Sequence, residues 1–176
     1  MFKRFIVRLA KWRTRLIPDK IFLIVASIII GILAGLAAVA LKTSVHFMQD
    51  FLHSTFKDQY NTYLYAVYPI VGIFLSTLFI KYVLKGKLNR GIGNVIIEIS
   101  NKKGVIARHK LYSQLISSFF TLGFGGSAGL EAPISVTGAA IGSNTAQVLR
   151  IGEKERKLLL GCGAAAGIAA IFNIPI

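Results

Sequence analysis

The chain has 176 residues, of which 54% are hydrophobic, and its mean hydropathy is +0.63. This composition excludes an ordinary soluble domain and indicates a membrane protein. The net charge of +14 does not indicate nucleic-acid binding, because the basic residues lie in patches between apolar spans and no nucleic-acid-binding motif occurs.

The first segment, residues 1–20, predicts a basic amphipathic helix on the inner membrane surface. Apolar side chains from Phe2 to Leu16 recur at helical spacing, and lysines and arginines fill the other face. A cleaved signal peptide is the alternative. It is disfavoured because no small-residue cleavage site follows a short apolar core.

Two uncharged stretches follow, residues 21–41 and 63–80, and each can cross about 30 Å of hydrocarbon as a helix. Basic residues dominate both the N-terminus and residues 81–110, which places these two segments in the cytoplasm. We therefore expect residues 42–62 to form an external loop. His46 and His53 in this loop are interpreted as interfacial residues, and no metal site is predicted.

Within residues 81–110, the sequence RGIGNV leads into the short apolar run VIIEI, residues 95–99. Its length fits a re-entrant half-helix. A surface loop before a short interfacial helix fits equally well, and the sequence leaves both interpretations open.

Glu131 is the only formally charged side chain between Leu111 and Leu149. An ionisable group inside so long an apolar run is a candidate functional residue. Glycines from Gly123 to Gly129 break the helical pattern, and proline suits the first turn of a helix. We therefore predict a helix, a break, and a second helix that starts near Pro133, with Glu131 at its mouth, deep in the membrane. Such a helix N-terminus attracts anions.

Residues 150–157 are predicted to be a charged connector, and residues 158–176 a last apolar segment. Cys162 is interpreted as a small packing residue. The apolar segment ends without a polar flank and no second copy of the pattern appears, so we expect a chain that is truncated at its C-terminus.

Three sequence blocks resemble the CLC family of chloride channels and proton-coupled chloride transporters. G-L-E-A-P at residues 129–133 resembles the family's G-(K/R)-E-G-P signature, and residues 161–176 resemble its next helix. RGIGNV resembles the family's G-S-G-I-P region more weakly. The resemblance implies an all-α, multi-pass integral membrane fold with broken and re-entrant half-helices. Residues 21–176 would be the first half of an inverted repeat, and the protein would be a homodimer.

The resemblance also implies roles for individual residues. Glu131 matches the gating glutamate, which blocks the anion path when charged and moves away when protonated. Gly129, Leu130 and Ala132 would offer backbone amides to the anion, although Leu130 replaces a basic residue and Ala132 replaces a glycine. Arg90, with Gly91 and Ile92, marks a possible inner mouth. Arg90 stands where the family has an anion-coordinating serine, and it either attracts anions or is simply a positive-inside residue.

We therefore expect chloride transport across a plasma or inner membrane, by a channel or a chloride/proton exchanger. A non-conducting membrane fragment is one alternative, and a proton-linked cation transporter that uses Glu131 is another. A structural Glu131 that pairs with a basic residue also remains open. Neither an enzyme activity nor a cofactor is predicted, because no nucleophile, base or metal constellation appears.

Overall fold

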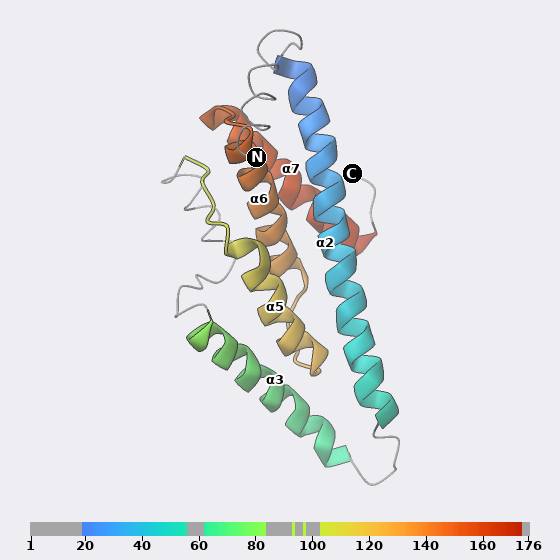
Figure 1. Cartoon of the computed structure of the whole chain (residues 1–176). Helices are drawn as coiled ribbons and strands as arrows, with labels where there is room; N and C mark the ends of the chain where they lie inside the picture. The colour runs from blue at the N-terminus through green and yellow to red at the C-terminus, as the bar shows by residue number, and fades with distance from the viewer. Residues whose placement is uncertain (1–18, 56–61, 84–92, 94–96, 98–102, 174–176) are drawn as a thin grey trace, which may run out of the picture.

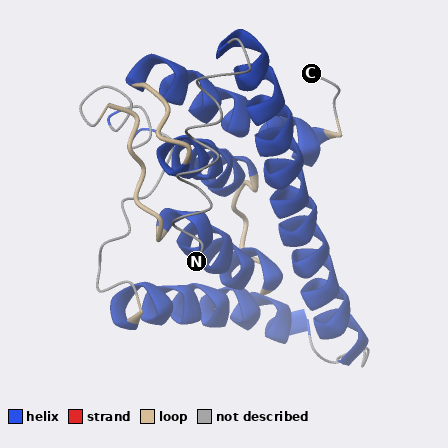
Figure 2. Ribbon diagram, turned by 45° about the horizontal axis from the view of Figure 1, so that its top comes forward, coloured by secondary structure: helices blue, strands red, loops and turns tan. Residues whose placement is uncertain are grey.

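The computed structural model describes residues 19–55, 62–83, 93, 97 and 103–173. Within these residues the elements are helices, and no strand occurs (Figure 2). The helices with defined bounds are α2 (Asp19–Thr55), α3 (Thr62–Tyr82), α5 (Lys110–Gly123), α6 (Glu131–Val148) and α7 (Glu153–Phe172). The predicted all-α architecture is confirmed. The predicted amphipathic segment, residues 1–20, and the predicted half-helix, residues 95–99, lie almost entirely outside the described residues.

Helix α2 is a single helix of 37 residues, and its stretch Lys20–Leu52 is long and apolar enough to cross a membrane. The prediction of a loop at residues 42–62 is therefore wrong for residues 42–55, and the external position of this segment stays a prediction. The helix continues to Thr55, and α3 begins at Thr62. No proline and no glycine lies between Leu36 and Thr55, and polar side chains by themselves do not end a helix.

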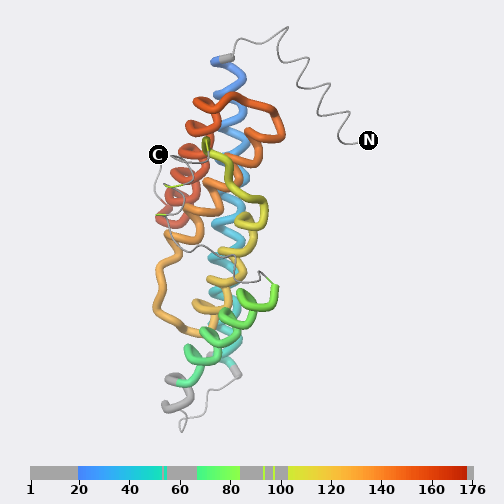
Figure 3. Tube along the Cα trace, turned by 90° about the vertical axis from the view of Figure 1, so that its left-hand side faces the viewer, coloured from blue at the N-terminus to red at the C-terminus, as the bar shows by residue number. Residues whose placement is uncertain are grey.

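Helix α2 runs along the length of the molecule (Figures 1 and 3). Helices α5, α6 and α7 pack against α2, and α3 packs against α5. Its N-terminal half packs through Ala26 and Ile30 on the end of α6 and the start of α7. Its C-terminal half packs through Ala38, Leu41 and Val45 on α5 and α6. The outer face of α2 exposes a row of isoleucines, leucines and phenylalanines, as expected for a surface in contact with lipid.

Helix α3 covers the predicted second span and includes Pro69. It packs on α5, where a Cβ atom built on Gly72 would lie 2.6 Å from the Cβ atom of Phe124. The hydroxyls of Ser76 and Ser117 are 2.8 Å apart and hydrogen-bond the two helices.

Helix α6 is the central element and packs on α2, α5 and α7. Every residue from Pro133 to Ala140 is buried. The polar side chain Ser143 bonds to the segment before α5: its hydroxyl accepts from the Ile106 amide at 2.9 Å and donates to the Gly104 carbonyl at 2.6 Å. The start of α5 is thereby tied to the middle of α6.

The prediction of a charged connector at residues 150–157 is wrong, because α7 already begins at Glu153. Glu153 and Lys157 form an i,i+4 ion pair of 2.8 Å on the first turns of α7. Acidic side chains at a helix N-terminus also interact favourably with the helix dipole. The charged residues therefore extend the helix, and only residues 149–152 connect α6 to α7.

Candidate functional site

The predicted break between two helices is confirmed at residues 124–130, which separate α5 from α6. The chain turns at Gly125, whose φ of +82° favours glycine. The amide of Gly126 then donates to the Thr121 carbonyl at 2.9 Å. A Cβ atom on Gly126 would lie 2.5 Å from that same carbonyl oxygen, so the close approach requires glycine.

The C-terminal part of α2 holds this break in place. The side-chain amide of Gln49 donates to the Leu122 carbonyl at 3.0 Å, and this carbonyl at the end of α5 also accepts the Gly125 amide at 3.0 Å. Met48 packs on Gly123, where an added Cβ atom would lie 3.1 Å from its Cγ atom. The sequence pattern does not single out Gln49 and Met48, because both lie in the stretch that it predicts to be a loop.

Glu131 is the first residue of α6, and Pro133 lies in the first turn, close to the predicted position. The first turn of a helix leaves its N–H groups without helical partners. Ile134 is the first residue whose amide returns to a helical carbonyl, that of Leu130, at 3.3 Å. Leu130 offers no side-chain cap. The amides of Glu131 and Ala132 are therefore available at a positive helix end, together with those of Gly129 and Leu130.

The carboxylate of Glu131 lies beside this group of amides. A Cβ atom built on Gly129 would be 3.3 Å from Glu131 Oε2, so the side chain folds back over Gly129. Leu130 is half-buried and packs with Leu122 and Ile134, which fixes the start of α6 to the end of α5. The structure thus brings together the four residues Gly129, Leu130, Glu131 and Ala132.

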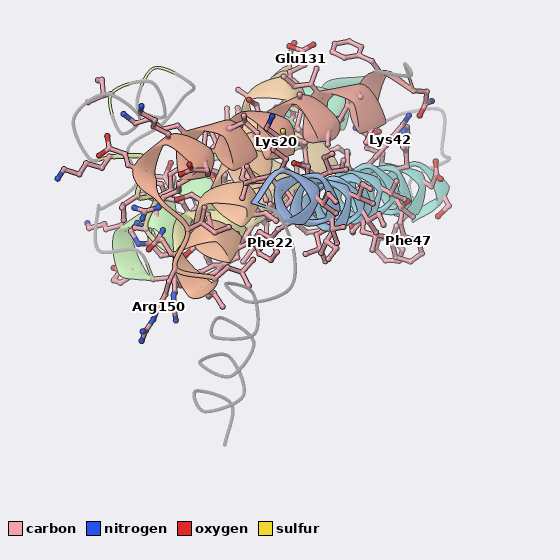
Figure 4. All side chains as sticks on the ribbon, turned by 90° about the horizontal axis from the view of Figure 1, so that it is seen from above. Lys20, Phe22, Lys42, Phe47, Glu131 and Arg150 are labelled. Carbon is pink, nitrogen blue, oxygen red and sulfur yellow. The ribbon has the colours of Figure 1, made fainter. Side chains whose placement is uncertain are left out.

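Glu131 is exposed in this chain and is not buried by its own fold. Figure 4 shows its side chain at the edge of the helices, on the opposite side from Phe22 and Phe47. It makes no ion pair with a residue that the structure describes. The structural salt-bridge interpretation of Glu131 therefore finds no partner in the described part of the chain.

The possible inner mouth at Arg90, Gly91 and Ile92 lies outside the described residues, so its relation to Glu131 stays a prediction. Among the described residues, no group of three or more histidines, cysteines or acids could hold a metal ion.

Comparison with protein families finds one match. Residues 72–176, more than half of the chain, match the family model described as voltage gated chloride channel. The matched range includes α5, α6, α7 and the break that precedes Glu131.

Curated relatives agree with this match. The chain is 30% identical over 158 residues to the H(+)/Cl(-) exchange transporter ClcA of Vibrio cholerae, covering 85% of this chain and 33% of the relative. It is 27% identical over 146 residues to the chloride/fluoride channel protein of Pseudomonas syringae pv. tomato, covering 82% of this chain and 32% of the relative. The chain spans about a third of the length of these relatives.

A slow cyanobacterial Cl-/H+ antiporter solved by X-ray crystallography has a similar fold. The TM-score is 0.70 at 23% sequence identity, over 90% of this chain and 38% of the antiporter chain. At this identity the likeness establishes the fold alone.

Proposed function

The chain belongs to the voltage-gated chloride channel family and is therefore an integral membrane protein, and from this we propose that it takes part in moving a small anion, such as chloride, across a membrane. In this proposal the protein works as a channel or as a chloride/proton exchanger. The relatives named as an exchange transporter and as a channel support both modes equally.

The observation that carries the proposal is the start of α6. The break after Gly123 ends in a helix whose first amides are free and whose positive dipole end is open. Such a terminus binds anions without any cationic side chain. This matters here because Leu130 replaces the basic residue of the family signature. Its side chain packs into the core instead, while its amide stays in place.

Glu131 would act as a gate at this terminus. Its carboxylate is itself an anion and lies over Gly129, and in this proposal a free anion would take the same place. While ionised, it would compete with chloride for the amides. Protonation removes its charge and weakens that competition, so anion binding would depend on pH. This would also link proton uptake to anion movement.

We further propose a multi-pass topology with the N-terminus in the cytoplasm, and a homodimer. The positive-inside distribution supports the orientation. The exposed apolar side chains of α2, from Ile24 to Phe47, support contact with lipid along much of that helix. Resemblance to the family supports the dimer.

The test is Glu131→Gln, which resembles the protonated side chain in charge and shape. We expect chloride to raise the Tm of the purified protein at neutral pH, since a ligand that binds only the folded state stabilises it. The rise in Tm should be larger in Glu131→Gln, because the uncharged glutamine side chain does not compete with chloride for the backbone amides. In liposomes, chloride efflux through the variant should persist and lose most of its pH dependence.

Glu153→Gln is the matched control, because Glu153 is the first residue of α7 as Glu131 is of α6. It should leave both the chloride-dependent Tm and the pH profile of flux unchanged. The same chloride-dependent rise in wild type and Glu131→Gln would remove Glu131 from the gating role. Chloride binding without flux above empty vesicles would favour the non-conducting alternative.

A further inference from the structure

Helix α5 buries a polar face. Lys110, Ser113, Gln114 and Ser117 follow i, i+3, i+4 and i+7 spacing, so they form one stripe, and each is at most 9% exposed. We call these four residues the α5 polar stripe. The side chain of Tyr112, which lies off the stripe, is exposed. A surface helix of a soluble protein buries its apolar side. Helix α5 buries Leu122 in this way, and it buries the polar stripe as well.

The middle of the stripe lacks hydrogen-bond partners among the residues that the structure describes. Within that part of the chain, Ser113 Oγ and Gln114 Nε2 have none, although these residues are only 0% and 8% exposed. On α6, which packs against α5, Thr137 Oγ1 also has none and the residue is 2% exposed. Ser117, by contrast, bonds to Ser76 of α3. A buried polar atom without a partner carries its full desolvation penalty, and this cost makes three examples on two packed helices informative.

The stripe has polar features at both ends. Lys110 begins it and is the last residue of the basic segment 81–110. Thr121 continues it one turn beyond Ser117, and the Thr121 carbonyl accepts the Gly126 amide inside the break before Glu131. The distance along the axis of α5 from Lys110 to Thr121 is roughly 16 Å, at 1.5 Å per helical residue. The stripe therefore leads from the basic segment to the glycine break, and residues 124–130 run back from there to the start of α6 (Figure 1).

We propose that the α5 polar stripe is hydrated, and that bound water connects its Lys110 end with the glycine break. Buried water typically makes two to four hydrogen bonds to polar groups that are otherwise unsatisfied. The two hydroxyls can each donate and accept, and Gln114 Nε2 can only donate, so water oxygen and hydrogen atoms satisfy all three. An acyl chain would satisfy none of them. The residues that would hold this water all belong to this chain, and they are distinct from the residues whose amides lie at the start of α6.

Cysteine reactivity tests the proposal. Ser113→Cys and Thr137→Cys are made in a Cys162→Ser background, in the full chain in liposomes. The control is Ala38→Cys, because Ala38 is 1% exposed in an apolar cluster. The reagent is 2-aminoethyl methanethiosulfonate, which reacts with the thiolate. A thiol buried in apolar surroundings stays protonated, so the two stripe cysteines should react at least about tenfold faster than the control. Rates equal to that of Ala38→Cys would overturn the proposal.

Ser113→Ala gives a second readout that does not depend on a reactive thiol. If the stripe were dry, removal of a hydroxyl that lacks a partner would raise the Tm, by about 2–4 °C. In a hydrated stripe the water loses one partner, so the Tm should stay constant or fall. A rise in Tm would contradict hydration. Neither readout involves anion flux, and the outcome therefore does not depend on the proposed function.

Discussion

Gly138 of α6 and Gly163 of α7 are in direct backbone contact. A Cβ atom on either residue would overlap the carbonyl oxygen of the other. Gly142 has the same relation to the Leu159 carbonyl one turn away. Gly138 and Gly142 thus form a packing face of α6 against α7. This contact holds α6 by its middle and leaves its N-terminus at the edge of the helices.

Gly163→Ala should therefore destabilise the protein. Overpacking of a tight contact costs about 1–3 kcal/mol, which corresponds to a loss of roughly 2–4 °C in Tm per kcal/mol. Gly161→Ala on the same helix is the control, because a Cβ atom there meets nothing within 4 Å in the described structure. It should keep or raise the Tm, since alanine is the better helix former. Equal Tm values for the two variants would contradict the close contact.

Gln49→Leu should loosen the break before Glu131. The variant keeps the approximate volume but removes the hydrogen bond to the Leu122 carbonyl, with an expected loss of about 1 kcal/mol in the free energy of unfolding. Ser44→Ala is the control on the same helix, because its hydroxyl bonds only to the Ala40 carbonyl of α2 and is exposed. Hydrogen exchange of the Gly126 amide should quicken in Gln49→Leu alone. Unchanged exchange would show that α2 does not hold the break.

Ser143→Ala should lower stability more than a typical surface change. Its hydroxyl accepts hydrogen bonds from the Ile106 amide and, at 3.1 Å, from the Gln147 side-chain amide, and it donates one to the Gly104 carbonyl. Loss of the hydroxyl leaves a buried N–H without a partner, at about 1–3 kcal/mol. Thr145→Ala, on a half-buried position of the same helix, should have a smaller effect on the Tm. The interpretation fails if Thr145→Ala is the more damaging of the two.

The orientation in the membrane follows from the basic residues and can be tested by labelling. Ser54 lies exposed at the end of α2, and Lys103 lies exposed in the segment before α5. In a Cys162→Ser background, an impermeant reagent added outside intact cells should label Ser54→Cys and not Lys103→Cys. Permeabilised cells, in which both should react, provide the control. The reverse labelling pattern would invert the proposed topology.

Several features were determined by the local sequence. The glycines from Gly123 to Gly129 followed by Pro133 predict the break, because glycine and proline act through the conformation of their own backbone. The length of an uncharged stretch likewise predicts α3 and the first part of α2. The isolated charge of Glu131 singled out the residue that begins α6.

Other features depend on contacts between segments far apart in the sequence. Residues 42–55 read as a loop because of their polar and charged side chains, yet they are helical, since α2 packs on α5. Residues 153–157 are an exception, because the i,i+4 pair of Glu153 and Lys157 that supports the start of α7 is local. The exposure of Glu131 and the buried polar face of α5 arise from which helices meet. No local pattern in the sequence specifies that Gly138 meets Gly163, that Gln49 reaches Leu122, or that Ser113 faces the interior, because each depends on the position of a second helix.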